Sequence, residues 1–174
     1  KKDDFVHVES PAPNSPFYLG QENDKLYIRK PSLDICKSIL NEYKIVKLYW
    51  ETVKRDSCWV SIISGSPGIG KSWSANTMVW YLADRRESYW FHSALKQKLL
   101  ICEFPDGDGE PRIREYDDSY VKKNKPKPKP RTWYLYDSVG TRSTGTKLPF
   151  QAMPEGVPCL IFSSPKYSNY RAGL

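Results

Sequence analysis

Short apolar runs alternate with amphipathic stretches along most of this 174-residue chain. Runs rich in β-branched and aromatic residues favour strands buried in a sheet. They cover residues 58–64, 89–91, 99–104, 112–116, 132–136 and 159–165, with a shorter one at 26–28. A helical period predicts helices over 32–43 and 73–86. Strands that alternate with helices favour an α/β fold with a mainly parallel sheet.

Each predicted helix has one face suited to burial. Ser32 is placed to cap the first helix, and the apolar face of that helix consists of Leu33, Cys36, Ile39, Leu40 and Tyr43. The buried stripe of the second helix consists of Ala75, Met78, Val79 and Leu82. Residues 45–54 mix polar and apolar side chains and fit a further helix, which would lie between these two in the sequence. Turn-forming residues at 105–110 predict a hairpin insertion near 98–116.

The chain divides into a polar start and one domain. Residues 1–25 are rich in proline and predict an extended arm or linker, whereas residues 26–174 have the length of a single domain. No run approaches the 18 or more apolar residues of a membrane span, so we expect no membrane partner. The four cysteines are far apart and include no C-x-x-C pair. A reducing, intracellular location fits this pattern.

Residues 65–72 carry the strongest chemical signal in the chain. The sequence Gly65-Ser66-Pro67-Gly68-Ile69-Gly70-Lys71-Ser72 fits the phosphate-binding pattern G-x-x-x-x-G-K-[ST] at every fixed position. A predicted strand precedes it, and a predicted helix begins directly after it at Trp73. That order is required, because a helix N-terminus supplies N–H groups and a positive dipole end to the phosphates. The alternative is a glycine-rich turn that binds nothing.

Each residue type in this loop has a predicted role. Glycines allow the backbone to approach phosphate oxygens closely, and Pro67 restricts the loop by fixing its own φ angle. Lys71 is expected to reach the β- and γ-phosphates of ATP or another NTP, and the Ser72 hydroxyl is expected to bind Mg²⁺. ATPases and small kinases both use this loop.

A magnesium site needs a second anchor, for which Asp137 is the best candidate. It follows a β-forming run at 132–136, as the acid of a Walker-B strand does. The alternative is an Asp that starts a turn. Many ATPases have a Glu at the next position, where this chain has Ser138. Glu155 could supply a carboxylate from the following loop. A slow or partner-dependent ATPase is therefore as plausible as a rapid one.

The strand at 159–165 ends in hydroxyl groups. Ligands of parallel α/β sheets bind at the carboxyl ends of strands, so Ser163 or Ser164 could sense a γ-phosphate. Ordinary turn chemistry before Pro165 is the alternative. His7 and His92 are isolated in the sequence, and neither is predicted to bind metal or act in catalysis.

The net charge of +7 comes mainly from residues 122–131. This stretch contains no acid and carries six charges, on Lys122, Lys123, Lys125, Lys127, Lys129 and Arg131. The alternation of Lys and Pro over residues 125–130 predicts an extended, solvated segment. It could contact nucleic acid or act as a nuclear address, but a solvated surface loop is the favoured interpretation, since no aromatic residue interleaves the lysines.

The sequence resembles the P-loop ATPase domain of the Crinkler and retrotransposon-hot-spot protein group. The resemblance rests on the phosphate-loop motif at residues 65–72, on Tyr27-Ile28-Arg29-Lys30 before a helix, and on the ending at residues 163–170, Ser-Ser-Pro-Lys-Tyr-Ser-Asn-Tyr. It covers roughly residues 26 to 171. It implies a module related to AAA+ or STAND ATPases, often followed by a nuclease-like domain, in effectors that act in host cells, often in the nucleus.

The resemblance also implies roles for single residues. Lys71 and Ser72 would bind phosphate and Mg²⁺, Asp137 would be the Walker-B acid, and Ser164 and Asn169 would lie near the γ-phosphate. Ser138 departs from the pattern, and the sequence stops at Leu174 before a final strand, a second sensor or a nuclease domain. The domain is therefore expected to be truncated at its C-terminal end.

These observations predict a three-layer P-loop NTPase that binds and hydrolyses ATP with Mg²⁺ and acts as a conformational switch. An arginine finger could come from another subunit, which allows for self-association, or from Arg142 or Arg171. Two alternatives stay open. One is a small-molecule kinase, although residues 140–158 contain only Arg142 and Lys147 as candidate lid cations. The other is a nucleic-acid-binding module gated by nucleotide, which would use residues 122–131.

Overall fold

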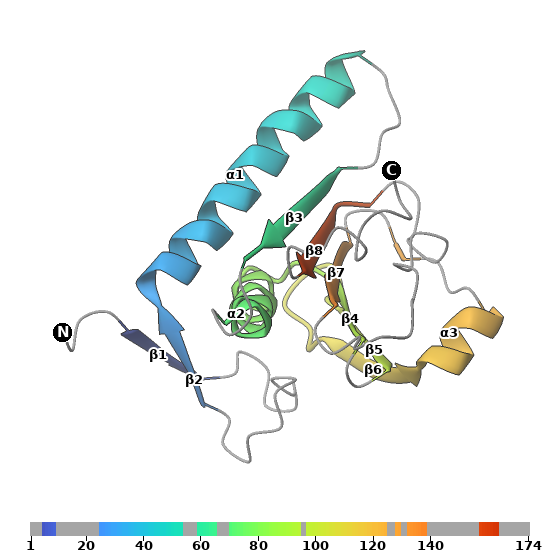
Figure 1. Cartoon of the computed structure of the whole chain (residues 1–174). Coiled ribbons are helices and arrows are strands. Elements are labelled where there is room, and N and C mark those ends of the chain that lie inside the picture. Colours follow the sequence, from blue (N-terminus) through green and yellow to red (C-terminus); the bar gives the residue numbers. More distant parts are fainter. Residues whose placement is uncertain are drawn as a thin grey trace.

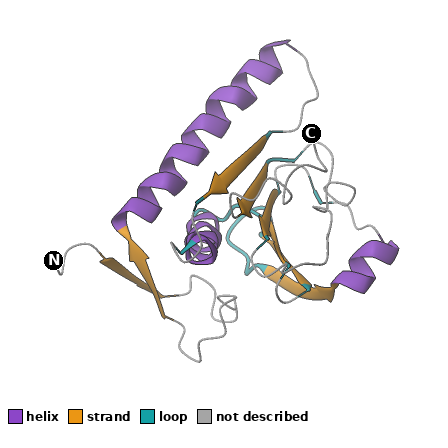
Figure 2. Cartoon of the chain, in the orientation of Figure 1, coloured by secondary structure: helices purple, strands orange, loops and turns teal. Residues whose placement is uncertain are grey.

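The computed structural model shows an α/β protein built around one mixed sheet (Figures 1 and 2). It describes residues 5–9, 25–53, 59–65, 70–94, 97–124, 128–129, 132–138 and 157–163. The six strands of the main sheet are β3 (Val60–Ser64), β4 (Tyr89–Ser93), β5 (Lys98–Glu103), β6 (Arg112–Asp117), β7 (Trp133–Asp137) and β8 (Cys159–Ser163). The helices are α1 (Lys30–Val53), α2 (Lys71–Asp84) and α3 (Asp118–Asn124).

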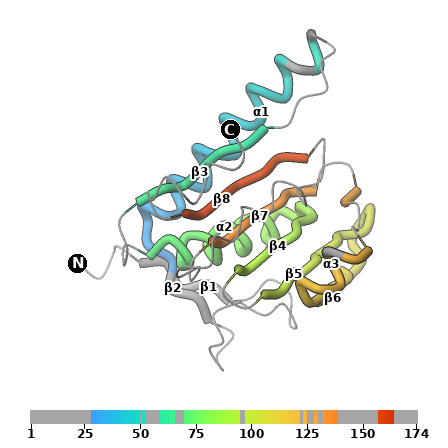
Figure 3. The backbone as a smooth tube through the Cα atoms, turned by 45° about the vertical axis from the view of Figure 1, so that its right-hand side comes forward, coloured from blue at the N-terminus to red at the C-terminus, as the bar shows by residue number. Residues whose placement is uncertain are grey.

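The sheet has the order β3-β8-β7-β4-β5-β6 (Figure 3). The ladders β3–β8, β8–β7 and β7–β4 are parallel, whereas β4–β5 and β5–β6 are antiparallel. The predicted hairpin at 98–116 is therefore confirmed as β5 and β6. Strands β4, β7 and β8 are buried along their whole length. Strands covered on both faces are apolar throughout, which is why these three were recognisable in the sequence.

Helices lie on both faces of the sheet. Side chains of α1 and α2 share one apolar cluster with Tyr89, Phe91, Leu135 and Phe162. On the opposite face, Val121 of α3 joins a second cluster that includes Trp90, Tyr134, Tyr136 and Ile161. Alternate residues of each central strand thus point to opposite layers. The α/β class and the mainly parallel order of the central strands agree with the prediction.

Helix α1 is longer than the sequence pattern predicts. The pattern indicates a helix over 32–43 and a separate one over 45–54, but the chain forms one helix of 24 residues. Residues 44–53 contain no Gly or Pro, and Lys47 pairs with Glu51 one turn later, at 3.7 Å. Such a segment extends an existing helix readily, since only nucleation is costly.

The predicted buried stripes of both helices are confirmed. All four residues of the stripe in α2 are buried, as are Cys36, Ile39 and Leu40 of α1. Tyr43 of α1 packs edge-on against Trp133 of β7, with ring centroids 4.8 Å apart, and also contacts Trp59. These aromatic contacts hold α1 against the sheet.

A second, two-stranded sheet precedes α1. Strand β1 (Phe5–Glu9) pairs antiparallel with β2 (Lys25–Arg29). The sequence predicts only an extended arm over 1–25, so β1 was missed, whereas β2 matches the short strand predicted at 26–28. Ile28 is fully buried and packs against Leu33, Trp73 and Trp80. This contact places the start of α1 beside α2.

Three cysteines lie buried in the described part of the chain. They are Cys36, Cys102 and Cys159, all with free thiols. Burial raises the pKa of Cys36 to about 12 and that of Cys102 to about 11. The thiols of Cys36 and Cys102 therefore stay protonated near neutral pH, and all three cysteines pack as small core residues. Cys58 lies outside the described residues.

None of the described helices is long and apolar enough to cross a membrane.

Leu135 at the centre of β7 gives a direct test of the core. It is completely buried in the cluster beneath α1 and α2. We expect Leu135→Ala to lower the free energy of unfolding by about 2–5 kcal/mol, because it removes buried methyl groups and leaves a cavity. Val60→Ala on the edge strand β3, where Val60 is 40% exposed, should cost less than about 1 kcal/mol. Urea denaturation measures both, and equal losses would contradict this placement of the core.

Candidate functional site

The carboxyl ends of three parallel strands meet at one edge of the sheet. Ser64 of β3 pairs with Ser163 of β8, and Phe162 of β8 pairs with Asp137 of β7. The register therefore brings Gly65, Ser163 and Asp137 to the same edge, with β8 between the other two strands. Ligands of open α/β sheets bind outside such carboxyl ends. The sequence motifs at 65–72 and 137 thus belong to one region.

Lys71 is held at the start of α2. It is only 6% exposed, and its Nζ donates a hydrogen bond to the carbonyl oxygen of Gly65, at 2.6 Å. Lysine is rarely this buried without a partner. Gly70 forms the N-cap with φ of 89°, a left-handed conformation that glycine adopts without strain. Gly70 and Lys71 thus join the end of β3 closely to the first turn of α2, where Ser72 is half-buried.

Asp137 is the last residue of β7 and is also 6% exposed. Side chains alternate between the two faces along a strand, so Asp137 points to the same face as Trp133 and Leu135. That face is covered by α1 and α2. The carboxylate of Asp137 therefore lies on the face over which α2 begins. Asp137 ends a buried strand and is itself buried. Burial of a carboxylate is costly unless it is paired or binds a cation.

Ser93 is a residue of this region that the sequence interpretation missed. It is buried at the carboxyl end of β4, where its Cα partner in the parallel ladder is Asp137. Because the two residues are paired, they point to the same face of the sheet. The backbone N–H of Ala94 also donates to the carbonyl oxygen of Asp137, at 2.9 Å. The polar end of the apolar run at 89–91 is the signal that could have revealed it.

Ser138 has a structural role at the position where many ATPases have a Glu. Its hydroxyl donates to the carbonyl oxygen of Phe162, at 2.8 Å, and its backbone N–H donates to the same oxygen, at 3.0 Å. Ser138 thus fastens the end of β7 to β8. The side chain is buried and carries no carboxylate that could orient a water molecule.

Several predicted site residues lie outside the described residues. They are Ser66, Pro67, Gly68, Ile69, Arg142, Lys147, Glu155, Ser164, Asn169 and Arg171. Ser163, the alternative to Ser164, is fully buried as the last residue of β8. Trp73 lies in the first turn of α2, half-buried, and packs against Ile28.

The residues at this edge fit a magnesium–nucleotide complex. Mg²⁺ in such sites is usually held by one or two carboxylates together with phosphate oxygens and water, not by an all-protein cage. Ser72 and Asp137 could supply the protein ligands. Among the described residues, no group of three or more His, Cys, Asp or Glu could hold a metal ion by itself.

His92 is not isolated, contrary to the sequence interpretation. It is buried on the opposite face of the sheet, where its Nδ1 is 2.8 Å from the hydroxyl of Tyr134 and its Nε2 contacts the carboxylate of Asp118. Its ring also meets that of Tyr136, with centroids 5.3 Å apart. Burial raises the pKa of Tyr134 and that of Tyr136, the latter to about 12. This network fastens the start of α3 to β4 and β7.

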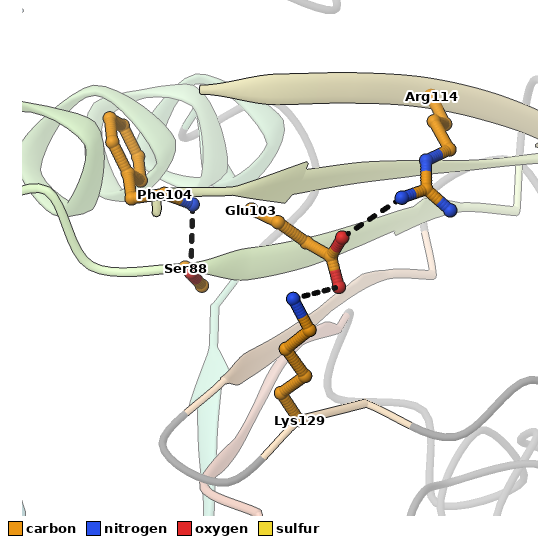
Figure 4. A network of polar contacts seen from close by, with 5 residues as sticks. All are labelled: Ser88, Glu103, Phe104, Arg114 and Lys129. Carbon is orange, nitrogen blue, oxygen red and sulfur yellow. Dashed lines mark hydrogen bonds and ion pairs between the residues drawn. The ribbon is translucent and has the colours of Figure 1, made fainter. Parts of the chain in front are cut away.

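One residue of the basic run at 122–131, Lys129, lies at the other end of the sheet. Lys129 lies 3.8 Å from Glu103, which also accepts a hydrogen bond from Arg114, at 3.2 Å (Figure 4). Close by, the backbone N–H of Phe104 donates to Ser88. Cys102, next to Glu103, pairs with Tyr89 at the amino end of β4, so this contact lies far along the strands from Asp137.

A cavity of about 500 Å³ opens beside this contact. Its charged lining consists of Arg85, Arg86, Arg112, Lys129, Glu87, Glu103 and Asp106. The two signs of charge nearly balance, so the cavity has no strong preference for an anion. It lies at the amino end of β4, away from Lys71 and Asp137, and we assign the candidate site to the motif-bearing edge. We choose this edge because its lysine, serine and buried acid are the residue types that bind phosphate and Mg²⁺, whereas the cavity offers only its size.

Comparison with protein-family models, with curated proteins and with solved structures returned no match. The resemblance to the Crinkler and retrotransposon-hot-spot ATPase domain therefore stays a prediction from sequence motifs.

Proposed function

We propose that this protein binds a nucleoside triphosphate, with ATP as the first candidate, together with Mg²⁺ and hydrolyses it slowly. One observation carries the proposal. Lys71 is buried at the start of α2 with its ammonium group at Gly65, on the sheet edge where the buried carboxylate of Asp137 also ends its strand. A buried lysine after one parallel strand and a buried acid at the end of another, with β8 between the two strands, are the parts that phosphoryl-transfer sites need.

Each residue has a defined part in this proposal. The ammonium group of Lys71 would leave the Gly65 carbonyl oxygen to contact the β- and γ-phosphates. The Ser72 hydroxyl and the Asp137 carboxylate would hold Mg²⁺, and Ser93 would support Asp137 from β4. When bound, Mg²⁺ neutralises charge that develops on the phosphate oxygens. Backbone N–H groups in the first turn of α2 would add to this stabilisation.

The hydrolysis step is proposed to be slow because Ser138 is engaged with Phe162. General-base or water-orienting groups typically contribute about 10²–10⁴-fold to rate. Without one at this position, nucleotide binding would mainly change conformation, and a partner could complete the site. We propose on the sequence motifs alone that the chain is a P-loop module of the Crinkler and retrotransposon-hot-spot kind.

Product analysis tests the proposal. Incubation with γ-labelled ATP and Mg²⁺ should release free phosphate at a low rate, and the release should disappear without Mg²⁺. Nucleotide binding is measured in parallel by calorimetry. Binding without phosphate release would remove hydrolysis and retain a nucleotide switch, whereas absence of binding would overturn the proposal. Release that persists in Lys71→Ala would indicate a contaminating enzyme.

A further inference from the structure

The second half of α1 carries an exposed apolar stripe. Ile45, Leu48 and Tyr49 are 70%, 66% and 62% exposed. Their spacing of three and four residues places them on one side of the helix. The core-facing residues Cys36 and Ile39 lie on another side and are buried. Contiguous exposed groups of large apolar side chains usually mark an interaction surface, whereas single ones need no explanation.

The stripe follows a regular seam along the helix. Positions 34, 38, 41, 45, 48 and 52 are spaced alternately by four and three residues, as in helices that pair with another helix. In the first half of α1 the seam is polar, with Asp34, Ser38 and Asn41 exposed. The seam is apolar at Ile45 and Leu48, and its last position is Thr52. Pairing along it is therefore confined to the C-terminal half of α1.

The charges beside the stripe are complementary to those of a second copy of the same helix. Lys44 and Glu51 are both exposed, and their separation of seven residues places them on the same flank of the seam. A copy that runs antiparallel across a twofold axis brings Lys44 of each copy opposite Glu51 of the other. The symmetry forms this pair twice, as in an isologous interface. Within one chain, the Glu51 carboxylate also lies 3.7 Å from the ammonium group of Lys47, one turn earlier in α1.

We propose that α1 pairs antiparallel with α1 of a second copy, through Ile45, Leu48 and Tyr49, with Lys44–Glu51 pairs at the flank. The surface lies where α1 ends beyond the amino end of β3 (Figure 1). Gly65 follows the carboxyl end of β3, so the surface is at the other end of this strand from the proposed nucleotide site. The inference does not depend on nucleotide binding.

Sedimentation equilibrium of the whole chain over a range of concentrations tests this proposal. We expect a monomer–dimer equilibrium whose dissociation constant rises at least tenfold in Leu48→Glu, since the variant would bury a charge in the interface. Leu48 is exposed, so folding should be unaffected, which circular dichroism checks. Ser38→Glu, in the polar half of the same seam, is the matched control and should not change the dissociation constant. A chain that stays monomeric at all concentrations would overturn the proposal.

Charge reversal tests the antiparallel orientation separately. Lys44→Glu and Glu51→Lys should each weaken the dimer several-fold, because each places like charges opposite one another twice. The double variant restores both pairs and should recover the affinity of the original chain. If the double variant is as weak as the single ones, or if neither single reversal weakens the dimer, the proposed orientation is wrong.

Discussion

Replacing Lys71 by Ala is expected to lower ATP affinity by about a hundredfold or more. Hydrogen bonds to charged groups contribute about 1.5–3 kcal/mol each, and Lys71 is proposed to contact two phosphates. Each 1.4 kcal/mol corresponds to a factor of ten. The ammonium group is held beside Gly65, the first residue of the predicted phosphate loop. No other described lysine occupies an equivalent place. Calorimetric titration with Mg²⁺ and ATP measures the effect.

Two further variants make this result interpretable. Lys71→Met keeps the length of the buried stem and should lose affinity to the same extent, which separates loss of charge from loss of packing. Lys98→Ala removes the same charge from β5, where Lys98 is exposed and pairs with Glu115, and should bind ATP normally. Unchanged affinity in Lys71→Ala, with the fold intact by circular dichroism, would refute the proposed nucleotide site.

Elements with a strong local signal were predictable from the sequence. Strands β4, β7 and β8 read as apolar runs because both of their faces are covered. Helix α2 follows a motif that requires a helix at that place. Strand β1 and helix α3 depend instead on distant partners. The ladder with β2 defines β1, and the contacts of Val121 and Asp118 hold the seven residues of α3.

The site was predictable by residue but not by arrangement. The motif identified Lys71 and Ser72, and the acidic strand end identified Asp137. Their placement on one edge depends on the strand order, in which β8 comes between β3 and β7 although it is last in the chain. Ser93 becomes a site residue only through its register with Asp137. The residue pattern within one segment does not show which strands pair or in which register, because pairing arises from the packing of the whole sheet.

Ser138 has a structural role at a position where many ATPases have a Glu. Its two hydrogen bonds to Phe162 keep β7 and β8 aligned at the edge where the candidate site lies. A Glu at this position could orient water but could not make the same short hydroxyl contact. In the proposed site, Lys71, Ser72 and Asp137 would bind phosphate and Mg²⁺, while Ser138 would provide no carboxylate to activate water. This combination suits a switch more than a rapid hydrolase.

Asp137→Asn is expected to weaken Mg²⁺-dependent ATP binding by about tenfold or more, with a much smaller effect on binding without Mg²⁺. The amide has nearly the shape of the carboxylate, so packing at the end of β7 should be kept. It lacks the negative charge that a hard divalent cation requires, and loss of one charged contact costs about 1.5–3 kcal/mol. Affinities measured with excess Mg²⁺ and with a chelator give the two values.

Asp117→Asn is the matched control, because Asp117 ends the edge strand β6 as Asp137 ends β7, but is exposed. It should change neither affinity. Equal loss of affinity with and without Mg²⁺ would remove Asp137 from the metal site and leave Lys71 as a phosphate contact alone.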